Sequence, residues 1–164
     1  MRTAFAVSAV ALALVVAPGG GVRAQTSFAL EGGVVTAFDE GLFQLGFRAS
    51  PLVPGRAGAD VAFATFPDAL INGFFIGMID LDVTYGVPLG ANAGLYPRFG
   101  VSGLAGAGEG GGGGVGGVNF GGGIMARPTN GLGIRFDYTY RRFYSDGESQ
   151  PLSSISVGLV LSHK

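Results

Sequence analysis

The chain has 164 residues, with 10 basic and 11 acidic side chains and a formal net charge of −1. It contains no cysteine, which excludes a disulfide framework and thiol chemistry. A net charge this close to zero lacks the strong basic bias of nucleic-acid-binding domains, so we expect no nucleic-acid partner.

The first residues have the pattern of a signal peptide. Arg2 is followed by an apolar run from Ala4 to Ala17, and small residues then predict cleavage after Ala24. An uncleaved membrane anchor is the alternative, but the run is shorter than the ~20 residues that a membrane-spanning helix needs. We therefore expect a signal peptide over residues 1–24 and one exported domain over residues 25–164.

The exported part alternates apolar and polar residues in eight stretches. Alternation with a period of two residues predicts half-buried β-strands. No later segment is apolar for the ~18 residues that would indicate a transmembrane helix. In chain order, we expect the strands at about residues 26–38, 43–50, 59–64, 78–85, 95–102, 118–127, 132–141 and 154–161.

The connections between these strands alternate in length. Compact turns with Pro, Gly or Asn alternate with longer, more polar loops, which is typical of transmembrane β-barrels with short periplasmic turns and longer external loops. Proline removes a donor from the strand ladder, so at Pro97 we expect a strand start or a bulge. The longer connections are predicted at 67–73, at 105–117, which is interpreted as a mobile glycine-rich loop, and at 145–152.

The charged residues of the strands lie on the face opposite the large apolar residues. An Arg or Lys at the bilayer midplane costs roughly 2–4 kcal/mol, so these charges must face a lumen or solvent. We predict an eight-stranded antiparallel up-and-down transmembrane β-barrel whose narrow lumen is plugged by Arg–carboxylate pairs. A narrow water path between the charges is the alternative. The predicted network consists of Glu31, Arg48, Asp60, Asp80, Asp82, Arg98, Arg127, Arg135, Asp137 and Arg141.

A soluble lipocalin-like barrel also alternates, but it would turn the charges outward and line a cavity with the apolar residues. Two features favour the membrane barrel. The polar face is rich in Gly, Ala and Ser, which suits a crowded lumen, and it lacks Lys, which soluble surfaces use freely. Aromatic residues near strand ends are interpreted as interfacial girdles, with ordinary apolar filling as the alternative: Phe28, Phe38, Phe43, Tyr85, Tyr138, Tyr140, Phe143 and Tyr144.

Three local runs, at residues 96–100, 119–123 and 133–138, resemble the OmpA/OmpX-like family of small outer-membrane β-barrels. The resemblance covers nearly all of residues 25–164. It implies a monomer in the cell outer membrane that contacts lipid and the barrel assembly machinery, with an extracellular or periplasmic partner that the sequence does not name. The C-terminus resembles the assembly signal of such barrels, although family members usually end in Phe; the matching residues are Ser156, Gly158, Leu161 and His163.

The sequence offers no candidate catalytic, cofactor or metal site. His163 is the one histidine, and the adjacent Ser162 points to the opposite face of a strand. Asp80 and Asp82 share a face, but the arginines on that face favour ion pairing over metal binding. Residues 110–114 lack the Lys-Ser/Thr of a phosphate loop. We therefore expect no enzyme but an envelope protein acting through structure or surface interaction, with a small-solute pore and a soluble barrel for an apolar ligand as alternatives.

Overall fold

The computed structural model describes residues 27–37, 40–50, 55–109, 111–127, 131–145 and 147–162. Several sequence-based expectations lie wholly or partly outside these ranges, including both ends of the expected strand at 26–38 and residue 146 of the expected loop at 145–152. The others are the signal peptide with its cleavage after Ala24, the girdle position of Phe38, the contribution of Gly110 to the glycine-rich segment, and the role of His163 in the assembly signal.

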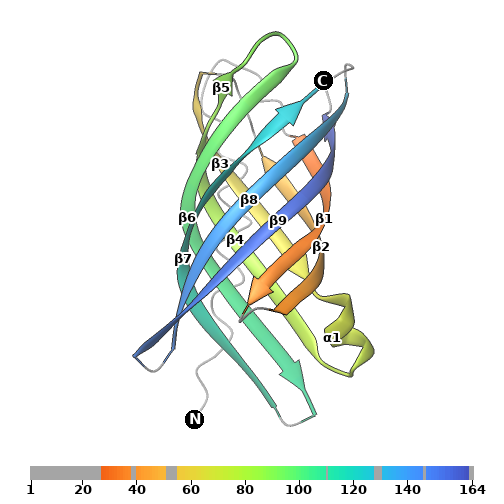
Figure 1. The fold of residues 1–164 in the computed structure, drawn as a ribbon, viewed down its shortest axis with the longest axis vertical. Helices are drawn as coiled ribbons and strands as arrows, with labels where there is room; N and C mark the ends of the chain where they lie inside the picture. The colour runs from red at the N-terminus through yellow and green to blue at the C-terminus, as the bar shows by residue number, and fades with distance from the viewer. Residues whose placement is uncertain are drawn as a thin grey trace.

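Eight long strands close into a barrel (Figure 1). Each strand pairs antiparallel with its neighbours, β4 pairs directly with β6, and β1 pairs with β9 to close the cylinder. A two-residue strand, β5 (Val87–Pro88), lies beside the start of β6. The predicted up-and-down barrel is thus confirmed. Its strands are β1 (Ser27–Ala37), β2 (Glu40–Ser50), β3 (Ala57–Thr65), β4 (Phe75–Tyr85), β6 (Ala93–Gly108), β7 (Gly111–Ala126), β8 (Leu132–Ser145) and β9 (Glu148–Ser162).

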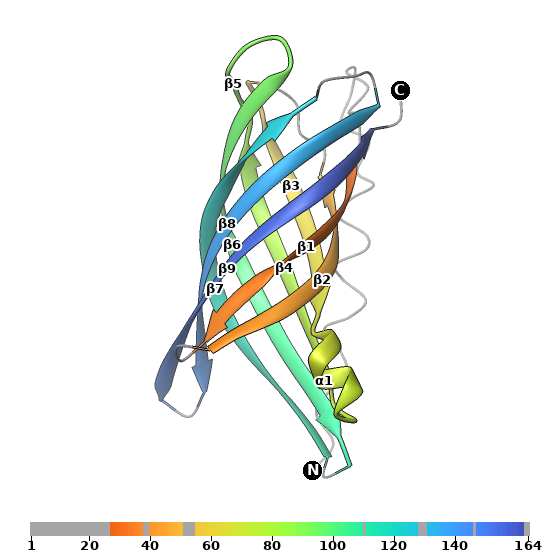
Figure 2. The same ribbon diagram turned by 45° about the vertical axis from the view of Figure 1, so that its right-hand side comes forward.

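The two ends of the barrel differ. The terminal end holds the start of β1 and the end of β9, whereas the hairpin end holds the short helix α1 (Pro67–Ile71) and the β6–β7 and β8–β9 hairpins. These two hairpins project beyond the end of β1 and the start of β2 (Figures 1 and 2). The β7–β8 pairing begins at Gly116 and the β1–β9 pairing ends at Ser153, so residues 111–115 and 148–152 pair on one side only.

The predicted loops at 105–117 and 145–152 are wrong. Strand β6 continues to Gly108 and β7 starts at Gly111, while β8 and β9 pair in register up to Ser145 and Glu148. The first hairpin consists mostly of Gly and Ala, so it carries no apolar–polar alternation that could reveal a strand. Backbone pairing does not require that alternation. The predicted loop at 67–73 contains α1.

Pro97 neither starts a strand nor makes a bulge, contrary to the sequence-based expectation. It lies inside β6, where it pairs with Gly122 in an uninterrupted register. On the other side of β6, the pairing with β4 ends at Arg98 and the pairing with β5 includes Leu95. Pro97 therefore lies between two partner strands, where the missing N–H is tolerated.

The side chains are arranged opposite to those of a soluble protein. Phe99, Phe136 and Ile155 point outward and are 64%, 57% and 63% exposed, whereas the inward Arg48 and Arg135 are 2% and 1% exposed. Phe143 also points inward and is buried, so its interpretation as a girdle residue is wrong.

None of the helices in the described ranges is long and apolar enough to cross a membrane.

Candidate functional site: the ionic layer of the lumen

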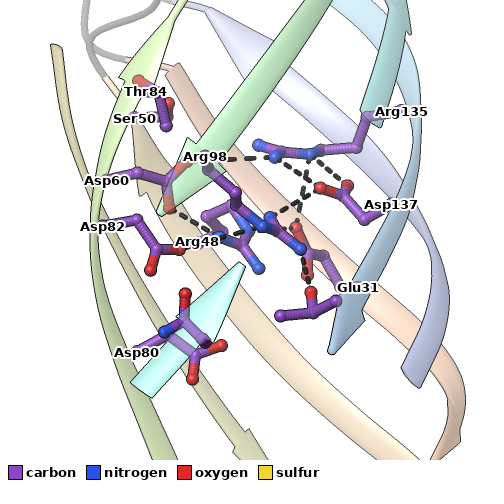
Figure 3. A network of polar contacts seen from close by, with 12 residues as sticks. Glu31, Arg48, Ser50, Asp60, Asp80, Asp82, Thr84, Arg98, Arg135 and Asp137 are labelled. Carbon is purple, nitrogen blue, oxygen red and sulfur yellow. Dashed lines mark hydrogen bonds and ion pairs between the residues drawn. The ribbon is translucent and has the colours of Figure 1, made fainter. Parts of the chain in front are cut away.

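Strand alternation places nine of the ten predicted charged residues in the middle of the lumen, where they form what we call the ionic layer. The tenth, Arg127, lies at the terminal end. Figure 3 shows arginine side chains gathered between carboxylates from opposite walls of the barrel. The ionic layer comprises Glu31, Arg48, Asp60, Asp80, Asp82, Arg98, Arg135, Asp137 and Arg141.

Arg48 joins three neighbouring strands. Its Nε donates to Glu31 Oε1 at 2.8 Å, and its Nη1 donates to Asp60 Oδ1 at 2.6 Å. These carboxylates come from β1 and β3, on either side of the β2 residue Arg48. Hydrogen bonds between charged groups are stronger than neutral ones, and a buried guanidinium needs such partners.

Arg135 and Arg98 share one carboxylate. Arg135 binds Asp137 through two contacts, Nε to Oδ2 at 2.7 Å and Nη2 to Oδ1 at 3.0 Å. Arg98 Nη1 donates to Asp137 Oδ1 at 2.7 Å, and its Nη2 donates to Thr139 Oγ1. Arg135 Nε also lies 3.4 Å from Glu31 Oε1, which connects this group to the contacts of Arg48.

Arg141 and Asp80 form a second group closer to the hairpin end. Arg141 Nε and Nη2 bind Asp80 Oδ1 and Oδ2 at 3.0 and 2.6 Å. Arg141 Nη1 donates to Ser154 Oγ at 2.7 Å, and Ser102 Oγ donates to Asp80 Oδ1 at 2.6 Å. A cavity of about 10 Å³, enough for about one water molecule, is lined by residues of both groups.

Asp82 is held less directly than the other carboxylates. Neither of its buried oxygens accepts a hydrogen bond from the described residues. Its Oδ2 lies 3.5 Å from Arg48 Nη1 and 3.8 Å from Arg98 Nε. Asp82 therefore contributes to the ionic layer through charge attraction rather than through a hydrogen bond.

Inward-facing glycines leave room for the arginine side chains. A Cβ at Gly158 would lie 2.9 Å from Arg135 Cγ and 3.0 Å from Glu31 Cγ, both closer than normal contact. Sequence reasoning identified Gly158 only as part of the assembly signal. Its inward position opposite Arg135 in the β8–β9 register is the feature that reveals this second role.

Apolar layers enclose the ionic layer on both sides. The layer at the terminal end consists of Ala29, Tyr96, Met125 and Val160, and the Tyr96 ring also lies under Arg135, with 4.7 Å from the ring centre to Cζ. The layer at the hairpin end is larger and includes Ala69 of α1. Sequence analysis missed the enclosing layers, although inward Met and Val residues near strand ends indicate them. The buried members at the hairpin end are Val35, Phe66, Met78 and Phe143.

The predicted assembly residues lie at different positions on β9. Ser156 and Gly158 point into the lumen, whereas Leu161 points outward and is half exposed. Throughout the described ranges, no group of three or more His, Cys, Asp or Glu side chains could hold a metal ion.

No family model matches the chain, and no curated protein matches its sequence. Solved structures are similar in fold. Neisserial surface protein A (NspA) is 10% identical with a TM-score of 0.59, covering 85% of this chain and 96% of its own. The N-terminal β-barrel domain of Pseudomonas aeruginosa OprF is 13% identical with a TM-score of 0.56, covering 82% and 97%.

A de novo designed transmembrane β-barrel is similar to the same degree. It is 10% identical, has a TM-score of 0.61, and the match covers 88% of this chain and all (100%) of the design. Because the design and the natural proteins match alike, the similarity concerns architecture rather than physiological role. The chain therefore has the eight-stranded fold of the OmpA/OmpX-like small outer-membrane β-barrels.

Proposed function

We propose that the chain is an integral protein of the cell outer membrane with a closed lumen, which supports envelope structure or surface interaction through its hairpin end. The observation that carries this proposal is the arrangement of side chains: apolar residues cover the outside of the barrel, and the ion pairs are enclosed within it. A continuous apolar exterior of this kind suits hydrocarbon and is unfavourable in water.

The alternative of a soluble barrel for an apolar ligand fits the inward face poorly. A lipocalin-like site requires apolar side chains around a cavity, whereas here the middle of the lumen holds charged residues in mutual contact. Fractionation distinguishes the two: a membrane barrel needs detergent for extraction, and a soluble barrel appears in the periplasmic fraction without it.

The alternative of a small-solute pore is tested by conductance in planar bilayers. The lumen holds paired charges, with a cluster of buried apolar side chains on each side of them, and these features favour no conductance or only rare, small openings. Unboiled samples of the refolded protein should show altered gel mobility, which verifies that a folded barrel was added to the bilayer. Steady conductance from such a sample would overturn the closed lumen.

This proposal also assigns an orientation. Export with cleavage after Ala24 would leave the terminal end in the periplasm and the hairpin end outside the cell. The barrel assembly machinery would fold the chain into the membrane as a monomer. N-terminal sequencing of the membrane-bound protein should begin at Gln25.

The external end would present exposed acidic residues, so a surface partner should carry basic groups. The described acids at this end are Glu40, Asp68, Glu109 and Glu148.

No catalytic role is proposed. Envelope structure and surface interaction require only the barrel and its projecting hairpins. Deletion of residues 105–114 should shorten the β6–β7 hairpin and leave the first three residues of β4, 75–77, without their β6 partners. The barrel below should remain, because the β4–β6 pairing from Met78 to Thr84 is untouched. If the hairpin deletion abolishes surface attachment while gel mobility is unchanged, surface interaction is favoured. If envelope integrity is lost only when the whole gene is deleted, and not when the hairpin is shortened, a structural role is favoured.

A further inference from the structure

Arg127 lies in a hollow at the terminal mouth of the lumen. It follows the last residue of β7. Most of residues 86–94, which comprise β5, the loop at 89–92 and the first two residues of β6, also line the hollow. The hollow has a volume of about 100 Å³ and is floored by Tyr96 and Met125 of the apolar layer. The loop is attached to this site, because the Arg127 backbone N–H donates to the Asn92 carbonyl oxygen at 2.7 Å.

The Arg127 guanidinium has no counter-ion among the described residues. Its Nε and Nη2 are buried without a hydrogen-bond partner there, whereas the other four inward arginines all bind carboxylates. The apolar layer separates Arg127 from those carboxylates. Burial lowers the pKa of Arg127, and no described carboxylate offsets this effect. An anion entering from the mouth would supply the missing partner.

A second hollow lies on the other side of the same loop. It is lined by Leu89, by residues 90–93, and by Ala126 and Ile134, which point outward from the barrel. Residues 90–93 line both hollows. One side of the loop thus offers a guanidinium, and the other side offers an apolar groove that continues the outer surface of the barrel.

We propose that the terminal mouth binds a membrane phospholipid, with its phosphodiester group on Arg127 and its apolar part in the groove beside Leu89 and Ile134. This inference rests on the proposed membrane location. A guanidinium matches phosphate oxygens in geometry and charge, and basic pockets at the membrane surface bind lipid headgroups. The adjoining apolar groove favours a lipid over a free anion, because a free anion gains nothing from Leu89 and Ile134.

Side-chain NMR of the full exported chain, refolded in a nonionic detergent and labelled with ¹⁵N-arginine, tests this site. The Nε–H resonance of Arg127 is identified by its loss in Arg127→Gln. Inorganic phosphate and dihexanoylphosphatidylglycerol are then added in separate titrations. We expect a saturable shift of this resonance with both probes, with the lipid half-saturating at a concentration at least tenfold lower than phosphate.

Two variants separate the contributions. Arg56→Gln removes an exposed arginine at the same end and should leave the lipid titration unchanged. Ile134→Ser should weaken lipid binding several-fold, measured as a higher half-saturating lipid concentration. It should leave the response to inorganic phosphate unchanged, because only the lipid occupies the groove.

The outcomes are distinct. Equal affinity for both probes, or no effect of Ile134→Ser, would reduce the site to one for free anions and overturn the lipid assignment. The absence of any saturable shift would overturn the site altogether. Gel mobility of the unboiled sample is recorded for each variant, so a protein that folds as a barrel but binds neither probe contradicts this inference without contradicting the membrane location.

Discussion

At the scale of single residues, the ionic layer depends on arginines that each reach more than one acceptor. The guanidinium group presents its donors in a planar fork, which allows Arg141 to bind both oxygens of Asp80 and still donate to Ser154. A buried ion pair of this kind gives little net stability compared with apolar residues of the same volume, but breaking it by removing one partner is strongly unfavourable.

Asp80→Ala should therefore be far more damaging than removal of the whole pair. It leaves Arg141 buried with only Ser154 as a described hydrogen-bond partner, and we expect the free energy of unfolding to fall by about 3–5 kcal/mol. The double variant Asp80→Leu/Arg141→Met should recover most of that loss. Denaturant unfolding in lipid vesicles measures both, and equal losses for the single and double variants would contradict the pairing.

Gly158→Ala should destabilise the barrel, because its Cβ would press on the side chains of Arg135 and Glu31. Overpacking of this kind costs about 1–3 kcal/mol. Gly113→Ala is the matched control, since a Cβ at Gly113 would have no atom within 4 Å. The same unfolding measurement applies, and equal stability of the two variants would show that the ionic layer adapts freely.

The sequence predicts which charged residues face inward, because alternation alone determines the face of a strand residue. It does not predict their partners. Arg141 and Asp80 are 61 positions apart and meet across the lumen, which depends on the registers of all the strands between them. Phe143 was misassigned for a different reason. The strand was expected to end at Arg141, whereas β8 continues to Ser145, so the alternation extends to Phe143 and turns it inward.

At the scale of elements, each long strand separates an apolar outer face from an inner face. This division makes the consequences of a charge depend on its position. Phe136→Arg introduces a charge on the outer face of β8, at an expected cost of roughly 2–4 kcal/mol, and should reduce membrane assembly. Gly113→Arg, in the projecting hairpin, should be tolerated, because a Cβ there would have no atom within 4 Å. Assembly is measured as the heat-modifiable fraction in membranes, and equal fractions would contradict the assigned faces.

The projecting hairpins should exchange their amide hydrogens faster than the barrel wall. Residues 111–115 and 148–152 pair on one side only, so part of their backbone N–H groups lack a strand partner. Hydrogen exchange resolved by residue should show these segments exchanging first, with residues 118–125 and 154–161 protected as internal controls. Uniform protection along β7 would indicate that the open edge is covered.

The existence of all eight barrel strands follows from their alternation, but their lengths do not. Within β6 and β7, the pattern disappears where Gly and Ala replace the apolar residues, and pairing continues nonetheless. The helix α1 was missed for a related reason. Its five residues are too few to show helical periodicity, and Pro67 at its start equally suits a loop.

At the scale of the whole molecule, the closed order of strands explains how a chain without cysteine can hold together. Closure leaves the barrel wall without a free strand edge, so every wall strand has two neighbours. The sequence could predict closure only by analogy and by an even number of strands. It could not distinguish an outward from an inward apolar face by period alone; the composition of the polar face favoured the arrangement that the structure shows.

The two apolar layers have a consequence for how the barrel responds to its surroundings. Dissolved ions weaken attractions between exposed charges, but they act far less on charges that they cannot approach. Val160 and Tyr96 on one side and Phe66 and Phe143 on the other lie between the arginines of the ionic layer and the bulk electrolyte. The barrel should therefore unfold at nearly the same denaturant concentration in dilute and concentrated sodium chloride. A protein so built can meet large changes in external salinity without loosening its interior.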